Sequence, residues 1–182
     1  MARGKLVLTY PDYLRMPEDR NRRELLGGDL YVTPAPSPAH QRVVANLIEV
    51  LNRWVNTHGL GRVFGAPIDV VLSELDVVQP DVIFVSSSRL AIVTAQSLQG
   101  APDLVVEVLS PSTAPVDRGR KMELYARSGV QEYWLVDPDQ HLVEQYLREG
   151  EGFRLVARAT EEASFTSVLL NGLRVELPRL WD

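Results

Sequence analysis

The sequence predicts an α/β protein in which a mixed central β-sheet is flanked by helices. Three observations support this prediction. Segment 38–58 repeats apolar residues at steps of three and four, as an amphipathic helix does. Short runs rich in Val, Ile and Leu follow it, with a second helical pattern over 117–128 between them. Near the C-terminus, two strand-like runs joined by a short turn favour a mixed sheet over a purely parallel one.

A short helix and a hairpin are expected before the long helix. Thr9 precedes a short helical pattern that has Pro11 in its first turn, where proline is tolerated. Gly27-Gly28 separates the runs 24–26 and 29–32, and two glycines in this position are typical of a tight β-hairpin.

The long helix has a defined start, a defined end and one apolar face. Ser37 is a suitable N-cap, and Pro38 suits the first helical position. Gly59 ends the pattern, because glycine readily adopts the left-handed conformation found after helices. The apolar face consists of Val43, Val44, Leu47, Ile48, Leu51, Trp54 and Val55.

The remaining elements are strands and one more helix. Asp117 is the expected N-cap of helix 117–128, and Gly129 ends it. The strand-like runs are 62–64, 68–72, 78–85, 104–109, 132–136, 142–147 and 153–159.

Length and composition predict a single domain, residues 1–182, in the cytoplasm. A chain of 182 residues with 45% hydrophobic and 24% charged residues has ordinary globular values. No apolar run approaches the ~18 residues that span a bilayer, and no signal-like stretch follows the N-terminus. The absence of cysteine excludes disulfides and thiolate metal sites, so Asp, Glu and His are the candidate ligands.

The net charge of −5 argues against a large nucleic-acid-binding surface, because such surfaces are basic. Two local basic clusters exist. The first cluster consists of Arg15, Arg20, Arg22 and Arg23. We expect these side chains to lie on a solvated face of the protein. We expect the second to lie beside the candidate site described next: Arg118, Arg120 and Lys121. A bound cation would neutralise part of the negative excess.

Two apolar strands each carry one acidic residue, Asp81 and Glu107. A carboxylate in a sheet interior loses hydration unless a positive charge compensates it, and two converging carboxylates favour a divalent cation. Lys121 shares a helix face with Leu124 and Tyr125, which mark the side that packs on the sheet, so Lys121 is expected to point towards Glu107. Together these residues predict a metal-dependent hydrolase, and most readily one that cuts phosphodiesters.

The same residues resemble the PD-(D/E)xK nuclease superfamily. Its pattern places Glu-x-Lys within one strand, whereas Leu109 stands here where the lysine is expected and the nearest lysine is Lys121. That displaced lysine is a feature of one branch, the Uma-two family of restriction-endonuclease-like proteins. Five blocks are similar to that family and occur in its order: 24–30, 36–40, 79–82, 106–112 and 121–138.

The resemblance implies a restriction-endonuclease-like core and Mg²⁺-dependent hydrolysis of DNA, with Mn²⁺ as a substitute cation. It implies that Asp81, Glu107 and the backbone carbonyl of Val108 bind the metal ion, since Mg²⁺ prefers oxygen ligands. A metal-bound water would be the nucleophile, and Lys121 would orient it or stabilise the transition state.

The resemblance extends to two further residues and to assembly. It implies that Glu24 completes the metal shell or orients Lys121, and that His40 contacts a phosphate or a ligand water. Nucleases of this architecture often dimerise to cut both strands, so a symmetric homodimer is expected.

Simpler structural interpretations compete with these roles. Glu107 and Lys121 form a structural ion pair in the alternative view, Asp81 belongs to a turn, and His40 lies on the surface. Three functions follow: a DNA endonuclease, a non-catalytic binding or oligomerisation module, and a metal-dependent phosphoesterase for a small substrate. The endonuclease is favoured over the non-catalytic module if Asp81, Glu107 and Lys121 converge on one cation-sized site. It is favoured over the phosphoesterase if an open basic cleft surrounds that site, whereas a closed pocket favours the phosphoesterase.

Overall fold

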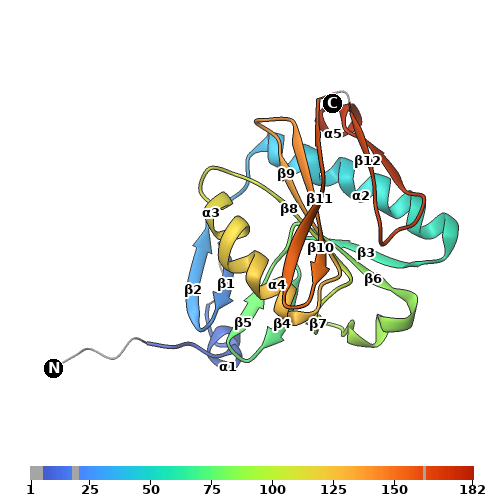
Figure 1. Ribbon diagram of the computed structural model, residues 1–182. Helices are drawn as coiled ribbons and strands as arrows, with labels where there is room; N and C mark the ends of the chain where they lie inside the picture. The colour runs from blue at the N-terminus through green and yellow to red at the C-terminus, as the bar shows by residue number, and fades with distance from the viewer. Residues whose placement is uncertain (1–5, 18–20, 162) are drawn as a thin grey trace.

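Two large β-sheets, a small two-stranded sheet and the helices packed on them make up the described part of the protein (Figure 1). The computed structural model describes residues 6–17, 21–161 and 163–182. Arg20, which belongs to the first basic cluster, lies outside the described residues. No helix in the described part of the chain is long and apolar enough to cross a membrane.

The larger sheet has six strands, and only the β8–β9 pair is parallel. The sheet is therefore mixed, as predicted. Its strands, in spatial order, are β11 (Gly152–Thr160), β10 (Leu142–Glu149), β9 (Glu132–Asp137), β8 (Leu104–Val108), β6 (Val82–Ser86) and β3 (Gly61–Gly65).

A second sheet, which the sequence did not predict, has five strands, and only its β4–β7 pair is parallel. The predicted hairpin forms part of it, with Gly27 and Gly28 at φ values of 59° and 77°. The strands, in spatial order, are β2 (Asp29–Thr33), β1 (Arg22–Leu26), β5 (Asp76–Val78), β4 (Asp69–Ser73) and β7 (Ser97–Gln99).

The prediction of one strand over 78–85 was wrong. The chain leaves β5 after Val78, passes Gln79 and Pro80, and enters β6 of the other sheet at Val82. Proline has no N–H to donate to a strand ladder, so it interrupts the run. Asp81 consequently lies at the junction between the two sheets.

Helix α2 (Pro38–His58) covers one face of the larger sheet (Figure 1). Its predicted caps are present: the Ser37 hydroxyl accepts a hydrogen bond from the His40 N–H at 3.2 Å, and Gly59 has φ 63°. Most of the predicted apolar face is buried, namely Val43, Val44, Leu47, Leu51 and Val55.

The opposite face is covered by a continuous helical segment made of α3 (Ala114–Val116), a π-helical turn η2 (Asp117–Lys121) and α4 (Met122–Ser128). It begins three residues before the predicted start of 117, so the expected N-cap role of Asp117 was wrong. Asp117 lies inside the helical segment with its side chain buried. Gly129 ends the segment as predicted, with φ 102°.

The other elements are short. Helix α1 was predicted, and the backbone N–H of Thr9 donates to Asp12 at its start. A 3₁₀ segment, a two-stranded sheet and a C-terminal helical turn had no clear periodicity in the sequence. Their bounds are α1 (Tyr10–Leu14), η1 (Ser87–Ile92), β12 (Ser164–Thr166), β13 (Arg174–Glu176) and α5 (Pro178–Trp181).

Candidate active site

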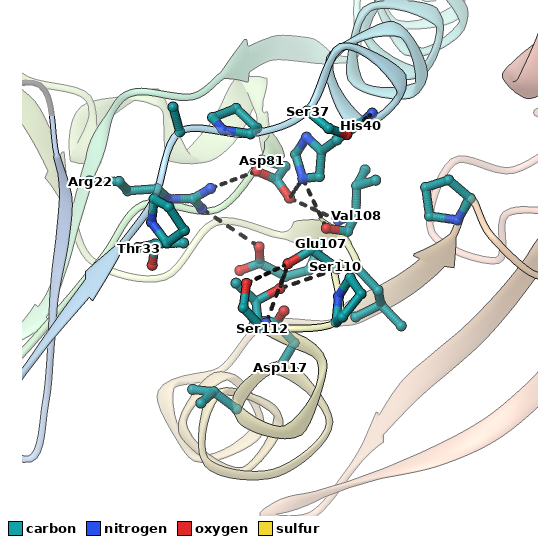
Figure 2. A pocket seen from close by; sticks show the side chains of 18 of the residues that line it. Arg22, Thr33, Ser37, His40, Asp81, Glu107, Val108, Ser110, Ser112 and Asp117 are labelled. Carbon is teal, nitrogen blue, oxygen red and sulfur yellow. Dashed lines mark hydrogen bonds and ion pairs between the residues drawn. The ribbon is translucent and has the colours of Figure 1, made fainter.

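A pocket of about 350 Å³ opens where the two sheets meet (Figure 2). The loop between β2 and α2 forms one wall, and the loop after β8 forms another. Four prolines stiffen its rim: Pro34, Pro36, Pro111 and Pro138. Every predicted site residue lines it: Glu24, His40, Asp81, Glu107, Val108 and Lys121.

Asp81 is held as a carboxylate by three donors. One oxygen accepts from Arg22 Nη1 at 2.8 Å, and the other accepts from the Val108 N–H at 2.8 Å and lies 3.3 Å from His40 Nε2 (Figure 2). Burial opposes ionisation, but the hydrogen bond from His40 and the charge of Arg22 outweigh it and lower the pKa of Asp81 to about 2. Asp81 is therefore ionised at any pH at which the protein works.

Glu107 has a more hydrophobic environment. Its side chain accepts hydrogen bonds from Lys121 Nζ at 2.7 Å and from the Tyr125 hydroxyl at 2.6 Å. The neighbouring residues of β8 pack into the apolar clusters on the two faces of the sheet, and Glu107 itself is only 2% exposed. Burial raises the pKa of Glu107 to about 8, opposed by Lys121 and reinforced by the carboxylate of Asp117.

Lys121 points inward, towards Glu107, as its helical position predicted. Its Nζ lies 3.0 Å from Glu24 and 3.3 Å from Asp117, in addition to Glu107. Burial opposes its charge, but these three carboxylates raise the pKa of Lys121 well above the usual value. Lys121 is therefore a permanent cation and cannot act as a general base at neutral pH.

His40, near the N-terminal end of α2, contacts two of the candidate metal ligands, the carbonyl of Val108 and the carboxylate of Asp81. Its Nε2 lies 2.9 Å from the carbonyl oxygen of Val108 and 3.3 Å from Asp81 (Figure 2). Both neighbours are acceptors, so Nε2 carries the proton. Nδ1 is buried and has no hydrogen-bond partner within residues 6–17, 21–161 and 163–182. The surface position considered for His40 was wrong.

Arg22 belongs to the site, which the sequence did not predict. It was expected on a solvated surface, but its side chain is only 19% exposed and lies between Asp81 and Glu107 (Figure 2). The physical reason is strand alternation, since Arg22 and Glu24 are two residues apart on β1 and project from the same face. That spacing was the available signal. Arg15, by contrast, is exposed.

Two other differences concern neighbours of the site. Arg118 and Arg120 were expected beside it, but they pair with Glu144 and Asp29, and neither lines the pocket. Asp117 and Tyr125, which had been assigned structural roles, contact Lys121 and Glu107 directly.

The buried charges suit one divalent cation. Four carboxylates (Glu24, Asp81, Glu107 and Asp117) face two permanent cations (Arg22 and Lys121), which leaves two negative charges when all are ionised. In residues 6–17, 21–161 and 163–182, no three His, Asp or Glu side chains form a metal-binding group by themselves. A cation here would need a backbone oxygen too. Two carboxylates and a carbonyl are hard oxygen donors that fit Mg²⁺ or Mn²⁺.

The two mixed sheets and the lysine-centred acidic cluster define a nuclease-like α/β protein. The chain belongs to the Uma2 family, described as "Putative restriction endonuclease", whose pattern matches residues 10–178.

The chain is similar to a solved structure over nearly its whole length and to a second protein over most of it. A crystal structure from Anabaena variabilis, titled "a putative nuclease belonging to DUF820", superposes with a TM-score of 0.80 at 21% identity. The alignment covers 96% of this chain and 97% of that one. "Uncharacterized protein sll1609" from Synechocystis is 26% identical over 148 residues, which are 80% of this chain and 83% of that protein.

Proposed function

We propose that the protein is a Mg²⁺-dependent phosphodiester hydrolase that cuts DNA as an endonuclease. The observation that carries the proposal is the meeting of Asp81, Glu107 and Lys121 in one pocket that holds four carboxyl groups and two permanent cations. The family description, "Putative restriction endonuclease", and the fold shared with the Anabaena protein described as "a putative nuclease" agree with this class.

Each residue has a role that its contacts support. Asp81, Glu107 and the carbonyl of Val108 would hold the cation, which would make a bound water acidic enough to attack phosphorus. Lys121, as a permanent cation, would hold that water or stabilise the developing charge on the phosphoryl oxygens.

Two further residues position these groups. Glu24 contacts Lys121 Nζ at 3.0 Å and accepts the Gln79 N–H at 2.8 Å, so it orients the lysine from β1. His40 donates to the Val108 carbonyl and to Asp81, and so holds both at the depth of the pocket.

A second candidate function, a phosphoesterase for a small substrate, is favoured by the shape and charge of the pocket. Its volume lies at the low end of the range of roughly 300–1,000 Å³ that is usual for small-molecule sites. Its lining has more acidic residues (Glu24, Asp81, Glu107, Asp117 and Asp139) than basic ones (Arg22 and Lys121). A long duplex would find few partners for its phosphates in such a lining.

The test compares Asp81→Asn with Asp103→Asn. Asp103 is a closely matched control, because it is also buried, accepts from an arginine Nη1 (Arg89) at 2.8 Å and from a backbone N–H (Ser86) at 2.8 Å. It does not line the pocket. Supercoiled plasmid, a short single-stranded oligonucleotide and a nitrophenyl phosphodiester are the substrates, each with Mg²⁺ or Mn²⁺.

We expect wild type and Asp103→Asn to nick the plasmid. In Asp81→Asn the nicking rate should be at least about 100-fold lower. Cleavage of the small diester without nicking would move the assignment to the phosphoesterase. Wild type that neither binds metal nor cleaves any substrate would contradict both and leave a non-catalytic module with a nuclease fold.

A further inference from the structure

The guanidinium of Arg22 lies beside both Asp81, which directly precedes β6, and Glu107, which is on β8. Its Nη1 is 2.8 Å from Asp81, and its Nη2 is 3.8 Å from Glu107 and 4.0 Å from Glu24 (Figure 2). One cation therefore already faces both carboxylates to which the proposed function assigns a metal ion.

The contacts of Arg22 are fewer than those of an arginine with a purely structural role. Among the residues that the structure describes, only Asp81 is close enough to Arg22 for a side-chain hydrogen bond, and the buried Nε of Arg22 has no hydrogen-bond partner. Arg89 gives the comparison within the same chain. It donates to Asp103 at 2.8 Å and, through its other Nη atom, to the carbonyl of Ala101 at 2.7 Å.

Arg22 also has space to move. It lines the pocket, and it is the first residue of β1, so its side chain reaches the carboxylates from the edge of the site. A guanidinium and a divalent cation cannot both lie between Asp81 and Glu107, because they repel each other at short range in a buried environment.

We propose that Arg22 is an internal counter-ion of the metal site, which a divalent cation displaces, and that the displaced guanidinium turns into the pocket to bind the phosphate of the substrate. The inference rests on the proposed function. The planar, forked guanidinium suits both positions, since it can pair with a carboxylate or with a phosphate through two N–H groups.

This exchange explains how a strongly acidic pocket stays folded without metal and then accepts an anion. Without metal, Arg22 neutralises the carboxylate of Asp81 and lies close to Glu107 and Glu24. With metal, the cation takes over that role, and the positive charge of Arg22 becomes available to the substrate. One residue would thus pair with two anions in succession, a carboxylate of the protein and a phosphate of the substrate.

Calorimetric titration tests the exchange with Arg22→Gln and the matched control Arg89→Gln. We expect Arg22→Gln to bind Mn²⁺ with a roughly tenfold lower dissociation constant than wild type, because a competing cation is gone. With Mn²⁺ saturating, the same variant is expected to bind thymidine monophosphate roughly tenfold more weakly. Arg89→Gln should match wild type in both titrations. Opposite changes for metal and phosphate would not arise from a loosened fold.

Side-chain NMR of the wild-type protein gives a second test that needs no variant. On titration with Mg²⁺, the Arg22 Nε–H signal should shift, whereas that of Arg89 should not.

Three outcomes would overturn the inference. If Arg22→Gln binds metal no more tightly than wild type, Arg22 is not a counter-ion of the site, while the proposed metal site still stands. The same conclusion follows if metal binds to wild type without shifting the Arg22 signal. Absence of metal binding in both wild type and Arg22→Gln removes the proposed function itself.

Discussion

At the scale of single residues, two carboxylates of the same chemistry have opposite environments. Asp81 faces Arg22, His40 and a backbone N–H, and its pKa falls to about 2. Glu107 is enclosed by the sheet, and burial raises its pKa to about 8 despite Lys121. One carboxylate is thus ionised in the metal-free protein, and the other keeps its proton through neutral pH. This division limits electrostatic repulsion before metal binds.

Glu107 makes the stability of the metal-free protein depend on pH. Its pKa is about 8 in the folded state and 4.5 as its ordinary value, so the folded protein holds the proton more tightly. The resulting stabilisation is full below pH 4.5 and is lost as the pH rises through 8. We expect the Tm of metal-free protein to fall by about 2–8 °C between pH 5 and pH 8.

Thermal unfolding in a chelating buffer measures this effect. Glu107→Gln keeps the shape but cannot titrate, so its Tm should change less over the same interval. A wild-type slope that the substitution leaves intact would assign the pH dependence to another group.

Lys121 is one of only two lysines in a chain with 19 lysines and arginines. Arginine cannot replace it, because a compact ammonium fits among Glu24, Glu107 and Asp117 where a planar guanidinium does not. We expect Lys121→Arg to lower the cleavage rate by at least about 100-fold and to lower the Tm. The control is Arg118→Lys, in a pair with Glu144 outside the pocket, which should leave the rate unchanged. Wild-type cleavage by Lys121→Arg would show that only charge matters at this position.

The sequence predicted the placement of part of this site. Asp81 and Glu107 were identifiable because each is a charge in an apolar run, and Lys121 because it shares a helix face with Leu124 and Tyr125. Arg22 was not, because its partner Asp81 is 59 positions away and comes close only when β1 joins the second sheet. Tyr125 was taken for an apolar residue, since the sequence does not show that its hydroxyl reaches Glu107.

At the scale of elements, the long helix and the hairpin were predictable from local rules. Ser37, Gly59 and the Gly27-Gly28 turn act within their own segments, so their effect does not depend on the rest of the fold. The second sheet was not predictable in this way. It joins β1, β4 and β7 from distant parts of the chain, and the run 78–85 that looked continuous divides between two sheets.

The π-helical turn η2 contains both Asp117 and Lys121, whose side chains pair at 3.3 Å across four residues. Such turns insert one residue into a helix and occur often at functional sites. Removing one residue should restore α-helical hydrogen bonding and reduce the spacing of Asp117 and Lys121 to three residues, which changes the geometry of their contact. We expect deletion of Gly119 to lower the cleavage rate by at least about tenfold while the helical circular dichroism persists.

Gly119→Ala is the matched control for this deletion. A Cβ at this position meets nothing within 4 Å, so the substitution should stabilise the protein by about 0.5–1 kcal/mol and keep the wild-type rate. A deletion variant with the wild-type rate would remove the role that we assign to the π-helical turn.

At the scale of the whole molecule, we expect a symmetric homodimer. Strand β2 ends the five-stranded sheet in the described part of the chain, and it exposes Leu30 and Val32. An exposed sheet edge with apolar side chains is a ready site for pairing, and the same strand contributes to the pocket. Light scattering should give twice the mass of the chain, and Val32→Lys should shift it towards one chain. Wild type of single-chain mass at working concentration contradicts this expectation.

The charge of the whole protein determines how its binding to DNA depends on salt. The chain carries a net charge of −5, and its pocket is acidic, so only a few cations are available for phosphates. Each phosphate that a protein neutralises on duplex DNA adds about −0.9 to the slope of log affinity against log salt. With about three such contacts we expect a slope no steeper than about −3, measured by fluorescence anisotropy with Ca²⁺ in place of Mg²⁺.

A slope of about −6 or steeper would require a broad basic surface and a duplex lying across it, and the small, acidic pocket could then not be the main contact. A shallow slope with tight binding to single strands would instead place one strand, or one strand end, at Asp81 and Glu107.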